Sequence, residues 1–458
     1  MTVASHARLL PCDNRLGMCG IYFSLSRTGH ENPSQDIAEE LRHRGPDYSG
    51  TISTHVDFSR HLSAEESEDR ADDGGPDAAR TVYIDATASV LSLRGGEVIQ
   101  QPIPGQADAE GRPSSLLCWN GEAWSTSGKS VTGNDSIAVF NMLQRAVIDA
   151  GPSVEGRSNK PGSFSDDPST RVITAIRSIA GPYAFIFYDG VGGRIYYGRD
   201  CLGRRSLLQS MTPNGSLAIS SIADTSSLIP WVEVDADVVN VIDLEVFAAY
   251  QCASGSHGDV RHGGECGQQL PYILKDARRD PMLSLPGLSR ELPSSIVPSL
   301  SSRSEAVTQL EQELLSSLTS RILRIPHVPC LDGKTIPRGK IAILFSGGLD
   351  CTVLARLAHI VLPLDEPIHL LNVAFENPRV IAARNSSKDK GVHSDIENES
   401  HYEACPDRVT GRRSFSELRH VCPGRDWIFA AVRLSPCMSD VRALFTDSLQ
   451  HSRSTSHT

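Results

Sequence analysis

The sequence predicts two domains of different class: a strand-rich α+β domain, then a smaller α/β domain with a parallel sheet. Before residue 250, short apolar runs such as Gly20–Ser26 and Tyr183–Tyr188 recur with few helical stretches between them, which is typical of antiparallel sheet. Later, the unbroken run Ile341–Phe345 leads through two glycines into a helical pattern, and a second run follows at His369–Phe375. This order predicts a right-handed β-α-β unit whose strands are covered on both faces.

Length and charge set limits on the class of protein. The chain has 458 residues, enough for two or three domains, because single cores seldom grow past about 250–300 residues. Its 44 basic and 55 acidic residues give a net charge of −11, which argues against nucleic acid as a partner. Neither a membrane-spanning run nor a secretory signal is found. We therefore expect a cytoplasmic protein without a membrane partner.

Cysteine and histidine spacing indicates no metal held by the protein alone. The 11 cysteines form no CxxC pair, and the 15 histidines lack spacings such as HExxH. A disulfide framework is also not expected, because the cysteines are scattered and odd in number.

In the first domain, a helical passage at Glu31–Leu41 leads into RHRGPD at Arg42–Asp47. The pair Asn120-Gly121 is typical of a turn. A helix is expected at Ile137–Ile148 and a hairpin from Tyr183 to Tyr197. Further strands are expected at Thr81–Ile84, Ser89–Leu93, Leu116–Trp119 and Leu217–Ser220.

Composition marks the remaining segments. His61–Ala79 is acidic and Gly151–Thr170 is rich in Ser, Gly and Pro, so both are expected to be insertions with little fixed structure. Residues 251–302 are expected to form a flexible linker, and residues 446–458 a disordered tail. A helix at Arg303–Arg324, with Ser302 and Glu305 as a capping box, opens the second domain, residues 303–445.

The glycine loop SGGLD at Ser346–Asp350 is the first candidate site. Adjacent glycines allow positive φ and let an anion approach backbone amides, and the following helix N-terminus favours phosphate. An ordinary strand-to-helix turn is the alternative. The loop resembles the pyrophosphate-binding loop of the ATP pyrophosphatases, although Cys351 stands where that family has serine. The resemblance implies an ATP site formed by Leu344, Ser346, Gly347, Gly348, Leu349, Asp350, Cys351 and Val373.

Three separated motifs form the second candidate site. Cys19-Gly20 before a β-prone run, then RHRGPD, then NGE at Asn120–Glu122 resemble the class II glutamine amidotransferases, whose nucleophile is the N-terminal residue. The resemblance implies an αββα glutaminase over residues 19–250. Cys19 would attack the glutamine amide, its own α-amino group would accept the proton, and the Asn120 side chain and Gly121 N–H would form the oxyanion hole.

The same resemblance assigns the remaining glutaminase residues. Arg94 would bind the glutamine carboxylate and Asp135 its ammonium group. The residues expected to support the site are Arg42, His43, Arg44, Gly45, Pro46 and Asp47. For Cys19 the alternative is a small buried hydrophobe, for Arg94 a solvated arginine, and for Asp135 a helix N-cap.

Together the two sites resemble the asparagine synthetase family, and the segment Tyr402–Trp427 resembles its asparagine synthetase domain-containing members. The implied reaction uses glutamine, aspartate and ATP with Mg²⁺, and ammonia displaces AMP from β-aspartyl-AMP. A homodimer is a candidate assembly. The alternatives are a glutaminase-only paralogue and a degenerate one acting as a binding or regulatory module.

Two departures from the family bear on activity. Residues 1–18 form an N-terminal extension, so we hypothesise that translation begins at Met18 or that the extension is cleaved. No SGEGxDE motif follows the glycine helix, so the ATP pyrophosphatase-like domain is expected to be truncated.

Overall fold

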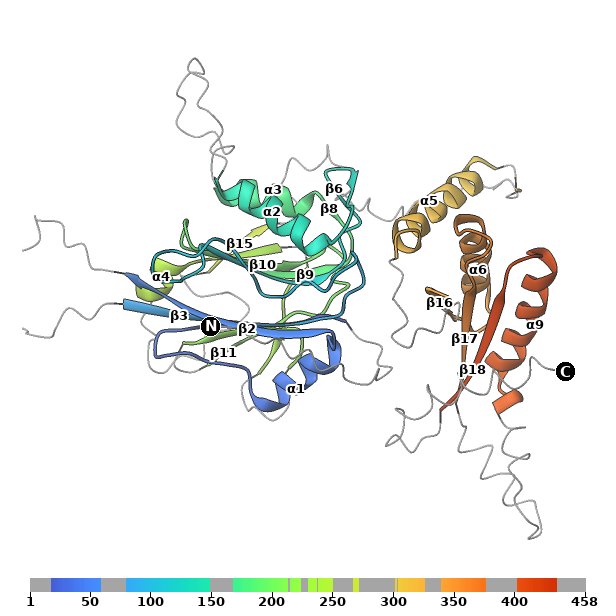
Figure 1. Cartoon of the computed structure of the whole chain (residues 1–458), viewed down its shortest axis with the longest axis horizontal. Helices are drawn as coiled ribbons and strands as arrows, with labels where there is room; N and C mark the ends of the chain where they lie inside the picture. Colours follow the sequence, from blue (N-terminus) through green and yellow to red (C-terminus); the bar gives the residue numbers. More distant parts are fainter. Residues whose placement is uncertain are drawn as a thin grey trace, which may run out of the picture. The chain divides into compact units, whose positions relative to one another are not determined.

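A computed structural model describes residues 18–58, 80–148, 168–212, 215–223, 230–236, 238–249, 267–271, 301–302, 304–325, 339–375 and 402–434. The chain divides into two compact units, whose described residues lie within 18–271 and 301–434 (Figure 1). Several segments named in the sequence analysis lie outside the described residues. They are the insertion at 61–79, the insertion at 151–170 as far as residue 167, the N-terminal extension as far as residue 17, and the tail at 446–458.

Two six-stranded antiparallel sheets form the first unit. The first sheet runs in the order β13 (Val232–Glu233), β11 (Leu208–Met211), β12 (Leu217–Ser220), β1 (Gly20–Ser26), β3 (Arg80–Val90) and β2 (Tyr48–Phe58). The second runs β15 (Gly267–Pro271), β14 (Val238–Asp243), β10 (Arg194–Arg199), β9 (Tyr183–Asp189), β5 (Ser115–Gly121) and β4 (Ile103–Pro104). A small third sheet contains β7 (Lys129–Ser130), β6 (Ser125–Thr126) and β8 (Ile179–Ala180).

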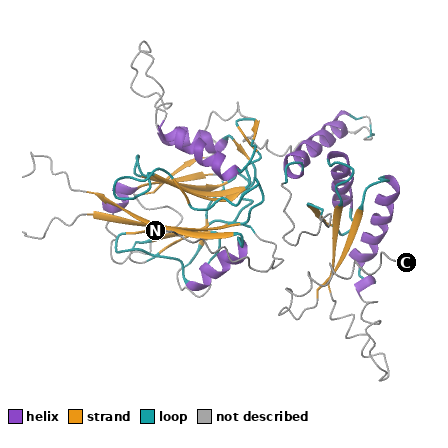
Figure 2. Cartoon of the chain, viewed as in Figure 1, coloured by secondary structure: helices purple, strands orange, loops and turns teal. Residues whose placement is uncertain are grey.

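Helices cover the outer faces of the two large sheets (Figure 2). On the first sheet lies α1 (Gln35–Arg44), which contacts β1 and β3. On the second lie α2 (Asp135–Ile148) and α3 (Pro168–Arg177), and the short α4 (Leu244–Ala249) contacts one strand of each sheet. The layer order is therefore helix, sheet, sheet, helix, the αββα arrangement that the family resemblance implies.

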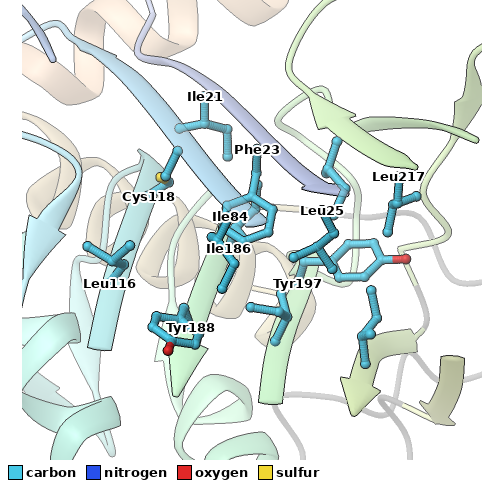
Figure 3. Packing of buried hydrophobic residues seen from close by; sticks show 14 of the residues in the cluster. Ile21, Phe23, Leu25, Ile84, Leu116, Cys118, Ile186, Tyr188, Tyr197 and Leu217 are labelled. Carbon is cyan, nitrogen blue, oxygen red and sulfur yellow. The ribbon is translucent and has the colours of Figure 1, made fainter. Parts of the chain in front are cut away.

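Both faces of the central strands are buried, which explains their unbroken apolar runs. Along β1, Ile21 and Phe23 enter the core between the sheets (Figure 3). Tyr22 instead packs with Ile37 and Leu41 of α1. Along β9, Ile186 faces the same inter-sheet core and Phe185 faces α2 and α3. Alternate residues of one strand thus serve two cores, as the pleat requires.

Several expectations for this unit are confirmed and some are wrong. The β9–β10 hairpin, β12 and α2 are confirmed. The expected strands at Thr81–Ile84 and Ser89–Leu93 are one strand, β3. Asn120-Gly121 is not a turn: the β5–β9 ladder runs through both residues, and a Cβ on Gly121 would lie 2.5 Å from the Pro182 carbonyl oxygen. That glycine permits close strand approach rather than a reversal of the chain. In addition, β15 lies within the expected linker.

The second unit is built on the parallel sheet β16 (Ile341–Leu344), β17 (Ile368–Phe375), β18 (Trp427–Leu434). Between the first two strands runs α6 (Leu349–Val361), and α9 (Pro406–Val421) runs between the second and third. The expected β-α-β unit is therefore confirmed. Helix α5 (Glu305–Ile322) contacts α6.

Two details of this unit differ from expectation. Burial alternates along β16 and β17, and Leu344 is 68% exposed, so these strands are not covered on both faces. The N-cap of α5 is Ser304, which makes no side-chain capping bond, so the expected capping box of Ser302 and Glu305 is wrong. Among the described residues, no helix is long and apolar enough to cross a bilayer.

Candidate functional site

Cys19 lies immediately before β1 and lines a small pocket. Its sulfur accepts the Leu91 backbone N–H at 3.4 Å, and the thiol faces the Leu91 carbonyl oxygen at 3.6 Å. The sequence-predicted residues Arg94, Gly121 and Asp135 line the same pocket. The fold thus brings Cys19 together with three residues that lie 75 to 116 positions further along the chain.

The electrostatics of the pocket act on the thiol in both directions. The pKa of Cys19 is raised from 9.0 to about 11, chiefly by burial and to a smaller extent by the Asp135 carboxylate. The Leu91 amide and the guanidinium groups of Arg205 and Arg44 act against this rise, because they favour the thiolate. With Cys19 joined to Met18 by a peptide bond, burial dominates, so the thiol is neutral near pH 7.

Strand geometry directs the N–H groups of Trp119, Gly121 and Ala123, in β5 and just beyond its end, to one side. The Glu122 N–H bonds the Pro182 carbonyl across the ladder, so the odd-numbered neighbours point away from β9. The Trp119 N–H donates to Gln101 Oε1 at 2.8 Å, and the Ala123 N–H to Asp135 Oδ2 at 2.8 Å. Between them, the Gly121 N–H points the same way, and Gly121 lines the pocket. It is therefore a hydrogen-bond donor available to a pocket ligand.

Asn120 is held beside the pocket but does not line it. Its side chain is buried, and Nδ2 donates to Ser221 Oγ at 3.3 Å. That hydroxyl also accepts the Ile21 N–H at 3.1 Å, which ties Asn120 to β1 just after Cys19. Asn120 Oδ1 is buried without a hydrogen-bond partner among the described residues. As it stands, the Asn120 amide supports the strand that carries Cys19.

Asp135 does not cap α2, so the alternative interpretation of this residue is wrong. The cap is Asn134, whose Oδ1 accepts the N–H groups of Ser136 at 3.0 Å and Ile137 at 3.3 Å. The Asp135 carboxylate instead accepts Trp119 Nε1 at 3.2 Å and the Ala123 N–H, at the pocket wall. Burial raises the pKa of Asp135, against the lowering effect of these two donors.

Arg94 is also buried rather than a solvated strand-end arginine. Its Nη1 donates to the Ala123 carbonyl at 3.2 Å, and its Nε lies 3.5 Å from Glu122 Oε2. Glu122 also pairs with Arg205 at 3.6 Å. Sequence reasoning did not assign Glu122 or Arg205. Their positions within NGE and within GRDCLGRRSLL at Gly198–Leu208 were the signals that could have found them.

Three of the RHRGPD residues contact Cys19 or the chain at the end of β3, and none of the six lines the pocket. Arg44 Nε donates to the Cys19 carbonyl at 3.3 Å. A Cβ on Gly45 would lie 2.4 Å from the Val90 backbone nitrogen, so only glycine fits there. Asp47 Oδ2 accepts the Ser92 N–H at 2.7 Å. His43 pairs with glutamates of its own helix, and Arg42 and Pro46 are exposed.

In the second unit, the glycine loop joins β16 to the N-terminus of α6. Gly347 has φ +83°, a conformation that favours glycine. Gly348 is the N-cap of α6, and its N–H donates weakly to Ser346 Oγ at 3.3 Å. Ser346, Gly348, Leu349 and Asp350 are exposed. The first-turn amides of α6 therefore lie beside an open loop, as an anion site requires.

The other expected ATP residues lie beside this loop. The Cys351 sulfur is 3.7 Å from Ser346 Oγ and 3.3 Å from the Gly348 carbonyl. The β16–β17 register puts Leu344 beside Leu371, on the face that also carries Val373. On this face Leu344 is exposed, and Leu371 and Val373 are partly buried. Within the described part of the chain, no group of three or more His, Cys, Asp or Glu side chains is placed to hold a metal ion.

The fold and the Cys19 pocket define a layered αββα protein with a thiol at a strand start. The chain is 26% identical to asparagine synthetase domain-containing protein 1 of Mus musculus and 28% identical to that of Bos taurus, in each case over 91% of this chain and 68% of the relative. The predicted resemblance to asparagine synthetase domain-containing proteins is therefore confirmed. No family model matches.

Among solved structures, the chain is similar to a Bacillus subtilis glutamine phosphoribosylpyrophosphate amidotransferase complexed with ADP and GMP. The TM-score is 0.30 and the identity 16%, over 56% of this chain and 49% of the other. So slight a similarity carries no weight for function.

Proposed function

We propose that the first unit hydrolyses glutamine and that the second uses ATP to amidate aspartate with the ammonia released. The observation that supports the first step is the convergence of Cys19, Arg94, Gly121 and Asp135 on one pocket. Such a pocket offers a nucleophile, an oxyanion donor and opposite charges for the two ends of an amino acid.

In the proposed reaction, the Cys19 sulfur attacks the glutamine side-chain carbonyl and the C–N bond breaks, which gives a thioester and ammonia. Water then cleaves the thioester to glutamate and regenerates the thiol. The Gly121 N–H stabilises the oxyanion, a contribution of roughly 3 kcal/mol for one such donor. Rotation of the Asn120 amide from Ser221 would supply a second donor.

This chemistry requires a base, because burial keeps Cys19 protonated near pH 7. Among the described groups of the pocket lining there is no histidine. A free α-amino group on Cys19 would serve, and a chain that starts at Cys19 would have one. We therefore propose that the active form begins at Cys19.

For the second step, we propose that the Ser346–Cys351 loop and the first turn of α6 bind the pyrophosphate portion of ATP, with the base on Leu344 and Val373. Bound Mg²⁺ would supply charge neutralisation as pyrophosphate leaves. The aspartate β-carboxylate would attack the α-phosphate of ATP, and ammonia would displace AMP.

The test compares the full chain, a variant that begins at Cys19, and the same variant with Cys19→Ala. If only the variant that begins at Cys19 releases glutamate, the glutaminase proposal is supported. When ATP, Mg²⁺ and aspartate are added to this variant with glutamine, AMP and asparagine should form. A native protein whose intact mass retains Met1 or Thr2 would overturn the glutaminase proposal.

A binding or regulatory module is the second candidate, and two observations favour it. The thiol pKa is raised, and the Asn120 amide is turned to Ser221 instead of the pocket. If the variant that begins at Cys19 binds glutamine without releasing glutamate, this candidate replaces the enzyme. Glutamate release without AMP or asparagine would leave a glutaminase alone.

A further inference from the structure

The segment Asp407–Ser414 of α9 lies directly against the glycine loop, although about 60 residues separate them in the chain. A Cβ on Gly347 would lie 2.4 Å from the Thr410 carbonyl carbon and 2.5 Å from the Gly411 nitrogen. Backbone atoms cannot yield as a flexible side chain does. The loop and α9 are thus fitted to each other at the backbone level.

One hydrogen bond from α9 fixes the orientation of a loop peptide. Ser414 Oγ donates to the Gly347 carbonyl oxygen at 2.8 Å. That oxygen and the Gly348 N–H belong to the same peptide unit and point in opposite directions, because the unit is trans and planar. Holding the carbonyl towards α9 therefore turns the Gly348 N–H away from α9, towards the open side of the loop, where its acceptor is Ser346 Oγ at 3.3 Å, a weak bond that a phosphate oxygen would replace.

A buried polar pair keeps α9 at this position. Asn372 of β17 donates to the Phe345 carbonyl at 2.8 Å, just before the loop, and to the Asp407 carbonyl at 2.9 Å, in the first turn of α9. Arg408, fully buried, donates to Asn372 Oδ1 at 2.6 Å and to the Val432 carbonyl at 2.9 Å. One hydrogen-bond network thereby joins the start of the loop, strands β17 and β18, and α9.

We propose that Ser414 is a positioning residue for phosphate: by holding the Gly347 carbonyl, it presents the Gly348 N–H to the pyrophosphate group of a nucleotide. This inference rests on the proposed nucleotide site. It adds a requirement that the loop motif alone does not contain, namely a hydroxyl on a helix far along the chain. Serine is suited to the role because its hydroxyl group can donate to a backbone carbonyl of the loop packed against α9.

The experiment uses three full-length variants, with inorganic pyrophosphate and adenosine as probes for titration calorimetry. Ser414→Ala removes the donor and Ser414→Thr retains it. Ser416→Ala is the matched control, because Ser416 is exposed and lies two residues away on the same helix. We expect Ser414→Ala to weaken pyrophosphate binding about tenfold, the worth of one charge-assisted hydrogen bond. Adenosine binding, thermal stability and both other variants should match the wild type.

A crystal structure of Ser414→Ala gives a second readout that needs no ligand. The Gly347–Gly348 peptide should rotate in this variant while α9 stays in place. If wild-type protein binds no pyrophosphate, the nucleotide proposal fails, and the peptide orientation alone decides whether Ser414 positions the loop. An unrotated peptide, or equal pyrophosphate affinity in Ser414→Ala and wild type, overturns the inference.

Discussion

The side-chain oxygen of Asn134 accepts the Ser136 backbone N–H at 3.0 Å and so caps α2. This bond leaves the next residue, Asp135, without a capping role and free to face the pocket through contacts with Trp119 and Ala123. A buried carboxylate that the helix does not need is a candidate for ligand binding. Removal of the Asp135 charge should therefore weaken glutamine binding without lowering the stability of the fold.

Asp135→Asn should raise the KM for glutamine about tenfold or more, because it removes a charge that would pair with the ligand ammonium. At neutral pH, the free energy of unfolding should stay unchanged or rise, since burial raises the pKa of Asp135 and makes its ionised form costly. Glutaminase kinetics of Asp135→Asn in the variant that begins at Cys19, and urea unfolding of the full chain, measure the two effects. Lower stability with an unchanged KM would show that the carboxylate is purely structural.

The pH dependence of that stability difference has a definite sign. Between the ordinary carboxyl pKa and the raised pKa of Asp135, the folded state binds more protons than the unfolded state. Wild-type protein should therefore gain stability relative to Asp135→Asn as pH falls through this window. Asp108→Asn is the control of opposite sign, because the Arg112 backbone N–H holds the pKa of Asp108 below its ordinary value. Any stabilisation from Asp108 should be lost as pH falls.

Cys19 in the full chain should react slowly with iodoacetamide. A pKa of about 11 rather than 9.0 leaves about a hundredfold less thiolate at pH 8 than in an ordinary cysteine. Arg205→Gln should slow the reaction further, because the guanidinium group favours the thiolate. Peptide mass spectrometry resolves the rate at each cysteine, and free N-acetylcysteine is the reference. A Cys19 rate equal to that of the reference would contradict the effect of burial.

The sequence was sufficient for features that depend on local pattern. Unbroken apolar runs predicted β9 and β17, and the glycine pair predicted the strand-to-helix loop. It was misleading at Asn120-Gly121, where a pair typical of turns lies inside a strand because Tyr183 passes too close for a side chain. β2 was missed because its residues Tyr48–Phe58 are largely polar and only partly buried.

Long-range polar pairing could not be predicted from the sequence. The pocket residues Cys19, Arg94 and Asp135 were proposed by resemblance, whereas Glu122 and Arg205 gain a role only through their pairing across the fold. Likewise, Asn372 is one polar residue in the apolar run HLLNVAF, and its partner Arg408 is 36 positions away in the chain. No periodicity indicates such a pair, because each member by itself contradicts the pattern around it.

Two substitutions in the glycine loop should separate stability from binding. Gly347→Ala should cost about 2–3 kcal/mol of unfolding free energy, because the new Cβ meets the α9 backbone at a positive φ. Gly348→Ala should leave stability nearly unchanged, since its nearest neighbour is Ser346 Oγ at 3.4 Å. It should nevertheless weaken pyrophosphate binding by crowding the anion. Denaturant titration and calorimetry test both, and equal stability of the two variants would refute the close packing.

Arg408→Met should destabilise the second unit by about 3 kcal/mol, because it leaves Asn372 Oδ1 and the Val432 carbonyl without their buried donor. Arg413→Met is the matched control, since Arg413 is exposed on the same helix. Hydrogen exchange of β17 and β18 measures the effect where it occurs: exchange should rise in Arg408→Met and stay at the wild-type rate in Arg413→Met. Exchange in β14 of the first unit should not change. Equal protection of β18 in both variants would mean that the arginine adds nothing to the stability of the sheet.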